Sequence, residues 1–131
     1  MKSIDKLTLA DDFMFARVFS IESVAKHFLE QLLGIQIDKI VTTTEQLSVK
    51  DTYSSLGARF DVYARDGKGT VYNIEMQNRS ENFSFERMRY YHSSLDIHHL
   101  QVGNDYTTLP KTFVIFVCQF NPFPDIYWGV V

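Results

Sequence analysis

The fold is decided by a stretch of alternating side chains at residues 58–77, which read ARFDVYARDGKGTVYNIEMQ. Apolar and polar residues alternate on both sides of a turn cluster, Arg65-Asp66-Gly67-Lys68-Gly69. A period of two is typical of β-strands, and glycines beside an aspartate favour a tight turn. These residues therefore predict an antiparallel hairpin.

The hairpin predicts one apolar and one polar face, because side chains two residues apart share a face of a strand. The apolar face consists of Phe60, Val62, Ala64, Tyr72, Ile74 and Met76, and the polar face of Arg59, Asp61, Tyr63, Asn73, Glu75 and Gln77. With the turn centred on Lys68, Asp61 lies as far before the turn as Glu75 lies after it. The two carboxylates then face each other, with Cβ atoms about 5 Å apart.

Two facing carboxylates repel each other unless something neutralises them. Mg²⁺ does so, since it prefers one or two carboxylates together with water and phosphate oxygens. The pattern alone favours a simpler interpretation, in which the acids belong to the solvent-exposed face of a half-buried sheet. A slip of the register would also separate Asp61 from Glu75.

The rest of the chain predicts a mixed-sheet α/β domain. Asp11 and Asp12 predict the start of a first helix, which runs through residue 19. Ser20 is predicted to cap a second helix over residues 21–33, which ends at Gly34. Residues 35–50 favour extended structure, and 82–100 a helix. Residues 112–118, TFVIFVC, predict a strand buried on both faces, as in a parallel sheet.

Composition limits the classes of protein that fit. The chain has 131 residues, 45% of them hydrophobic, which indicates a single domain (1–131) with a hydrophobic core. Its net charge of −3 excludes a strongly basic surface dedicated to binding nucleic acid. The lone cysteine, Cys118, excludes an intrachain disulfide. We expect a cytoplasmic protein, because the acidic start of the chain is unlike a signal peptide and no apolar run is long enough to span a membrane.

Five motifs occur in an order that resembles a known family. They are LADDFMF (9–15), RFDVY (59–63), YNIEMQ (72–77), RMRYY (87–91) and FVIFVCQFNPF (113–123). Together they resemble the PD-(D/E)XK nuclease family transposases, the recombination-promoting nucleases of bacteria, over nearly the whole chain. The resemblance implies a restriction-endonuclease-like α/β core, a mixed sheet flanked by helices, and a Mg²⁺-dependent DNA endonuclease for which Mn²⁺ substitutes.

The resemblance also implies roles for particular residues. Asp61 falls on the metal-binding aspartate, Glu75 on the acidic residue of the E-x-K element, and Gln77 on its third position, which is usually Lys in the wider superfamily. Asp12 would stand beside the site as a further acid. Asp61 and Glu75 would hold the metal, and Gln77 would orient a water or phosphate oxygen. The positive charge that Lys would bring must then come from elsewhere, with Arg59 and Arg89 as candidates.

A DNA-binding patch is predicted next to this site. Arg79, Arg87 and Arg89 cluster after Gln77, together with aromatic residues, and Arg59 lies on the face of Asp61. Such a cluster can grip a DNA backbone, and it can equally be the solvated side of a helix whose tyrosines pack on the sheet. His92 and His99 stand about 10.5 Å apart along a helix, too far to share a zinc ion. Cys118 is expected to fill space in its strand.

The C-terminus departs from the family pattern, because members usually continue into a further helical region. We therefore expect a domain truncated at its C-terminus, whose uncovered sheet and apolar 126–131 tail favour a homo-oligomer. The rival interpretation of function is a catalytically weak or inactive relative that binds DNA or a protein. A purely structural domain is the third alternative.

Overall fold

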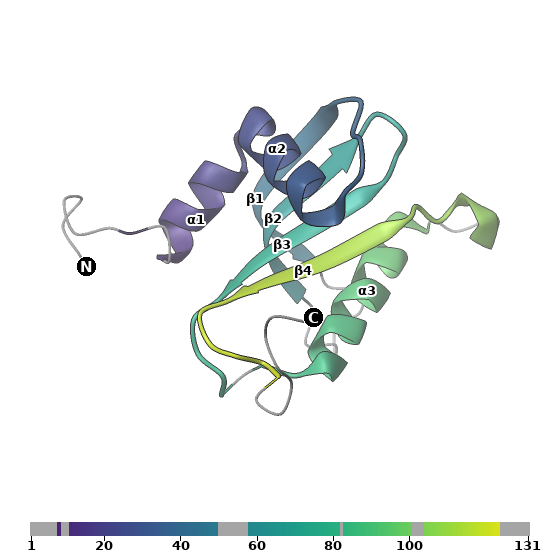
Figure 1. The fold of residues 1–131 in the computed structure, drawn as a ribbon. Coiled ribbons are helices and arrows are strands. Elements are labelled where there is room, and N and C mark those ends of the chain that lie inside the picture. Colours follow the sequence, from purple (N-terminus) through teal and green to yellow (C-terminus); the bar gives the residue numbers. More distant parts are fainter. Residues whose placement is uncertain (1–7, 9–10, 50–57, 82, 101–103, 124–131) are drawn as a thin grey trace.

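The computed structural model describes residues 8, 11–49, 58–81, 83–100 and 104–123. The elements in chain order are α1 (Asp12–Phe19), α2 (Glu22–Leu33), β1 (Ile40–Val49), β2 (Ala58–Asp66), β3 (Val71–Gln77), α3 (Phe85–His99), the 3-10 turn η2 (Tyr106–Thr108) and β4 (Thr112–Cys118). The strands form one sheet in the order β1-β2-β3-β4. Helices α1 and α2 lie on one side of this sheet and α3 on the other (Figure 1). In the described part of the chain, no helix is long and apolar enough to cross a membrane.

The predicted hairpin is confirmed. β2 and β3 pair antiparallel with Val62 opposite Ile74 and Ala64 opposite Tyr72, the register that centring the turn on Lys68 requires. The buried Asp66 stabilises the turn, since its carboxylate accepts hydrogen bonds from the Lys68 and Thr70 amides, both at 3.0 Å, and from the Tyr72 hydroxyl at 2.8 Å. β1 pairs antiparallel with β2, and β4 pairs parallel with β3, so the sheet is mixed as predicted.

The strand β4 differs from its prediction in burial. Its side chains contribute to the apolar clusters on both sides of the sheet, but all seven residues are only half-buried. The reason is its position as the last strand in the sheet order, with a paired neighbour on one side only. The most deeply buried strand is instead β3, which lies between β2 and β4 and in which every residue except Met76 is buried.

The two N-terminal helices follow the predicted boundaries with one correction. α2 ends at Gly34, whose φ of 65° is the left-handed conformation that glycine adopts without strain. Ser20 does not cap α2, as the sequence predicted, because the N-cap is Ile21. Ser20 instead closes α1, where its amide bonds the carbonyl oxygen of Ala16 at 3.1 Å.

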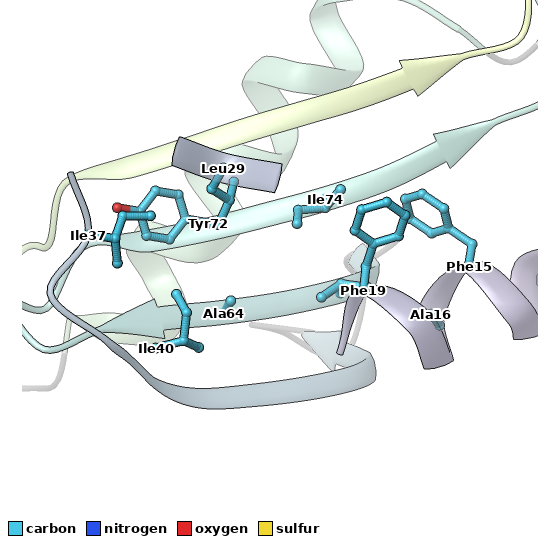
Figure 2. Close-up of a cluster of buried hydrophobic side chains, with 10 residues drawn as sticks. Phe15, Ala16, Phe19, Leu29, Ile37, Ile40, Ala64, Tyr72 and Ile74 are labelled. Atoms are coloured by element: carbon cyan, nitrogen blue, oxygen red, sulfur yellow. The ribbon is translucent and has the colours of Figure 1, made fainter. Parts of the chain in front are cut away.

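The main core lies between the sheet and the two N-terminal helices. Figure 2 shows Phe15 and Phe19 of α1 and Leu29 of α2 lying over Tyr72 and Ile74 of β3. The rings of Phe15 and Phe19 are 4.7 Å apart between centroids. A smaller cluster lies under α3 and consists of Phe60, Tyr63, Val71, Tyr91 and Leu95. This arrangement fixes β2 and β3 from both sides.

Phe60 contradicts the predicted apolar face. Its side chain packs on Tyr91 of α3, with ring centroids 5.1 Å apart, whereas Val62 and Ala64 pack under α1 and α2. The simple alternation therefore breaks at Asp61. The break coincides with a change in the pairing of β2 with β3, which positions the candidate site.

Candidate active site

Asp61 and Glu75 lie where the regular pairing of β2 with β3 ends. The last regular pair before them is Val62–Ile74. Beyond this pair, the carboxylates of Asp61 and Glu75 bind backbone amides of the opposite strand. The Asp61 amide donates to Oε2 of Glu75, and the Met76 amide donates to Oδ2 of Asp61 at 3.0 Å. Because each acid holds the strand that carries the other, both carboxylates are fixed in place side by side.

The polar face of β3 is buried, and it does not face solvent. Asn73, Glu75 and Gln77 are exposed by 0%, 4% and 9% respectively. Helix α3 covers this side of the sheet, so the interpretation of the acids as a solvent-exposed face is wrong. An ionised carboxylate at the depth of Glu75 costs several kcal/mol unless donors or cations compensate it, which makes a structural accident a poor explanation for it.

Gln77 is held at both ends of its amide group. Its Nε2 donates to the backbone oxygen of Arg79 at 2.7 Å, and its Oε1 accepts from Nη1 of Arg87 at 2.8 Å. The two bonds fix which way the amide points, since oxygen must face the donor and nitrogen the carbonyl. Gln77 therefore connects the end of β3 to helix α3.

Arg87 brings a positive charge to this end of the sheet. Its Nη1 bonds Gln77, and its Nη2 donates to the hydroxyl of Tyr91 at 2.9 Å. The guanidinium also stands 5.2 Å from the ring centroid of Tyr91 and 5.5 Å from that of Phe116. A planar fork held by two acceptors and two aromatic faces keeps one orientation, which a lysine ammonium would not do.

The pKa of the Tyr91 hydroxyl depends on the charges of the site. Burial raises the pKa of its hydroxyl, and the negative charge of Glu75 raises it further, with a smaller contribution from Asp61. Arg87 acts in the opposite direction through its charge and its hydrogen bond, without cancelling the rise. Tyr91 thus lies in the field of both carboxylates and of Arg87, and it stays protonated at neutral pH.

The start of α3 is fixed by a cap and by contacts between aromatic rings. The hydroxyl of Ser84 accepts a hydrogen bond from the Arg87 amide at 3.2 Å. Phe83 packs on Phe120 with centroids 5.6 Å apart, and Phe85 on Phe123 with centroids 5.5 Å apart. The segment after β4, part of the FVIFVCQFNPF motif, therefore holds the turn of helix that carries Arg87.

The structure separates the four arginines that the sequence grouped with DNA binding. Arg87 points to Gln77 and Tyr91, whereas Arg59, Arg79 and Arg89 are exposed. Arg87 therefore provides the cation next to Gln77. The sequence had suggested Arg59 or Arg89 as the source of this positive charge. The spacing of four between Arg87 and Tyr91 was the available signal, because it places both on one side of a helix. Asp12 begins α1, but its side chain lies outside the described residues.

The histidines and the cysteine have other partners. His92 Nδ1 lies 2.9 Å from the Thr112 hydroxyl, and His99 Nε2 lies 2.7 Å from the Tyr63 hydroxyl. Among the described residues no three of His, Cys, Asp and Glu gather around a common point. Burial raises the pKa of the Cys118 thiol, which therefore stays protonated and poorly nucleophilic at neutral pH.

The donor atoms around Asp61 and Glu75 fit a hard divalent cation. A carboxylate offers about four lone-pair sites, and the amide bonds to Oδ2 of Asp61 and to Oε2 of Glu75 use one site each. Two carboxylates with only oxygen donors suit Mg²⁺ or Mn²⁺, which complete their shells with water or phosphate oxygens. A third protein ligand is not needed for such an ion.

Comparison with known proteins identifies the family. The sequence matches the model of the PD-(D/E)XK nuclease family transposases over residues 9–126 of the 131-residue chain. The mixed sheet flanked by helices is consistent with the restriction-endonuclease-like α/β fold of this family. No curated protein and no solved structure matches the chain. Because the family model covers far more than half of the residues, the chain belongs to the PD-(D/E)XK nuclease family transposases.

Proposed function

We propose that this chain is a DNA endonuclease that hydrolyses phosphodiester bonds with a divalent cation, Mg²⁺ or Mn²⁺, held by Asp61 and Glu75. One observation carries the proposal. Two acids, one of them only 4% exposed, are fixed side by side by amides of opposite strands. An arrangement that holds two negative charges together in a buried place is stable when a cation sits between them.

The bound cation would polarise a phosphoryl oxygen and lower the pKa of an attacking water. Asp61 and Glu75 hold the ion and offset its charge. Hydrolysis forms a bond from the water oxygen to phosphorus, breaks the bond to one sugar oxygen, and transfers a proton to that leaving oxygen. The protein must stabilise the extra negative charge that the phosphoryl group develops on the way.

Arg87 supplies the positive charge in this scheme, and Gln77 keeps it in place. Lys at the third position of the E-x-K element would bring its own ammonium group. Here Gln77 contributes a neutral amide, and its Oε1 binds the guanidinium of Arg87 at 2.8 Å. Gln77 and Arg87 together thus take the place of one lysine. Arg87, on α3, carries the positive charge, and Gln77 positions it.

Plasmid nicking across a Mg²⁺ titration tests the proposed reaction. Glu75→Gln keeps an oxygen that can accept the Asp61 amide but removes the negative charge, so its fold should be preserved. We expect wild-type protein to nick DNA only with the metal present, and Glu75→Gln to be slower by a hundredfold or more, of the size found when one charge-stabilising group is lost. Glu86→Gln on the exposed side of α3 serves as the matched control.

Equal rates for wild type and Glu75→Gln would mean that the activity is contamination, and the enzyme proposal would fail. Wild-type protein that binds duplex DNA but never cuts it at any Mg²⁺ concentration would instead favour the rival, a binding module without catalysis.

A further inference from the structure

A polar pocket lies at the opposite end of the β2–β3 hairpin from the two acids. Its volume is about 450 Å³. The lining residues come from the hairpin turn, the end of α3 and the segment before β4; they are Arg65, Lys68, Gly69, Thr70, His99, Thr108, Leu109, Pro110 and Lys111. Neither the family match nor the proposed catalytic chemistry assigns a role to this pocket.

The pocket is positively charged. Arg65, Lys68 and Lys111 line it and are exposed, and no carboxylate is among the described residues that line it. Two acids lie near the turn. Asp66 is buried, and its carboxylate binds the Lys68 and Thr70 amides, whereas the exposed Asp38 accepts from the Gly67 amide and interacts with the charge of Lys68 alone among the three cations of the pocket. In a chain whose net charge is −3, this is a local concentration of cations.

Cationic side chains are needed for any anion to bind here. His99 ends α3, and the C-terminal end of a helix carries partial negative charge, which repels an anion. Lys111 has its ammonium 5.0 Å from the ring centroid of Phe113 and contributes at a distance. Arg65 and Lys68 are therefore the groups expected to contact the ligand, with the hydroxyl of Thr70 as an additional donor.

The pocket and Glu75 share one side of the sheet. Tyr63 and Arg65 are two residues apart on β2 and share the side of the sheet that α3 covers, and Asp61 lies four residues from Arg65, about 13 Å along the strand. Along α3, eight residues from Tyr91 to His99 give a similar separation of about 12 Å. Two independent elements thus set the same spacing between acids and pocket.

We propose that Arg65 and Lys68 bind a backbone phosphate of the DNA whose phosphodiester bond lies at Asp61 and Glu75. This inference rests on the proposed nuclease function and adds a second contact to it. A DNA strand carries one phosphate per 3.4 Å of helix axis, so a duplex that reaches the acids has phosphates about 13 Å farther along. Such a contact fixes the position of the duplex without reading its sequence.

The test compares two variants with the same loss of charge. Arg65→Gln/Lys68→Gln removes two cations from the pocket, and Arg17→Gln/Lys26→Gln removes two from α1 and α2 on the opposite side of the sheet. Binding to a duplex of about 30 base pairs is measured by fluorescence anisotropy over a NaCl series, with Ca²⁺ in place of Mg²⁺ to prevent cleavage. The slope of log Kd against log[NaCl] reports the phosphate contacts.

We expect the pocket variant to bind roughly tenfold more weakly at low salt. Its salt slope should be shallower by about one for each lost phosphate contact, whereas the control stays near wild type. Equal affinity and slope in the two variants would overturn the proposal. So would a pocket variant that loses binding of inorganic phosphate, followed by ³¹P NMR, but keeps the wild-type DNA slope, because the pocket would then serve a small phosphate compound.

The results distinguish a failure of the pocket proposal from a failure of the nuclease proposal. Nicking that depends on Glu75, together with an unchanged salt slope in the pocket variant, refutes the pocket and leaves the nuclease. A reduced slope in a protein that never cuts DNA refutes the nuclease and keeps the pocket as a DNA contact.

Discussion

At the scale of single residues, the chemistry depends on hydrogen bonds that tie Asp61, Glu75 and Gln77 to neighbouring strands and to α3. Each acid accepts an amide from the opposite strand, and Gln77 accepts from Arg87. These bonds exclude alternative side-chain positions, so the site is largely preorganised before any ion or DNA arrives. Its individual contributions can therefore be tested with substitutions that keep the shape of a side chain.

Asp61→Asn is expected to weaken Mn²⁺ binding by an order of magnitude or more. Asn keeps an oxygen for the Met76 amide, now bound at 3.0 Å, but lacks the negative charge that a hard cation requires. Titration calorimetry of wild type and variant measures the effect. Asp105→Asn, an exposed position in the segment before β4, is the control. An unchanged dissociation constant in Asp61→Asn would remove Asp61 from the metal site.

Arg87→Lys is expected to slow cleavage by about a hundredfold, although the charge is conserved. Lysine has no planar fork, so it loses at least one of the bonds to Gln77 and to the Tyr91 hydroxyl. The rate of plasmid nicking is compared with that of Arg89→Lys, an exposed neighbour on the same helix. Nicking at the wild-type rate by Arg87→Lys would show that the fork has no part in the reaction.

At the scale of elements, α3 connects the candidate active site to the basic pocket. Its first turn carries Arg87, and its last residue, His99, lines the pocket. His99 also anchors the helix to the sheet. Its Nδ1 lies 2.6 Å from the Leu95 carbonyl oxygen, which can only accept, so the proton is on Nδ1 and Nε2 accepts from the Tyr63 hydroxyl at 2.7 Å.

This anchor makes stability depend on pH. Burial lowers the pKa of His99 below its ordinary value of 6.5, and the hydrogen bond to the Leu95 carbonyl oxygen opposes this shift without cancelling it. His98 and Arg65 make smaller downward contributions and Asp96 a smaller upward one. The unfolded chain therefore takes up a proton that the folded chain resists. The free energy of unfolding is expected to fall as pH drops from 6.5 through the pKa of folded His99.

Urea unfolding at several pH values between 5 and 8 measures this dependence. His99→Gln should show a flatter profile than wild type, and His27→Gln, at an exposed position on α2, should keep the wild-type profile. A wild-type protein as stable at pH 5 as at pH 7.5, with no difference from His99→Gln, would contradict the assignment.

At the scale of the whole molecule, short-range patterns predicted more than long-range contacts. The hairpin register, the parallel last strand and the end of α2 at Gly34 follow from alternation, turn chemistry and glycine conformation, which are local properties. The closeness of Asp61 to Glu75 followed from the same local geometry, but their predicted cross-strand pairing did not, because the regular pairing ends at Val62–Ile74. These parts of the fold were within reach of the sequence because a few neighbouring residues determine them.

Features that depend on packing between distant elements were missed. Nothing near Glu75 in the sequence indicates that α3 covers it, so the polar face of β3 looked exposed. Phe60 changes sides because the pairing opens beside it, and β4 is half-buried because the sheet ends there. Arg87 could not be predicted as the partner of Gln77, because this contact depends on which side of α3 faces the sheet. Residues 124–131 lie outside the described part of the chain, and the truncated domain and homo-oligomer stay predictions.

A crystal of this protein soaked in Mn²⁺ and measured at an anomalous wavelength tests the central claim most directly. We expect one strong anomalous peak bound by carboxylate oxygens of both Asp61 and Glu75, at roughly 2.0–2.2 Å from each. Crystals of Glu75→Gln soaked in the same way should lack that peak. Full Mn²⁺ occupancy elsewhere, with no peak between Asp61 and Glu75 in the wild-type crystal, would contradict the account.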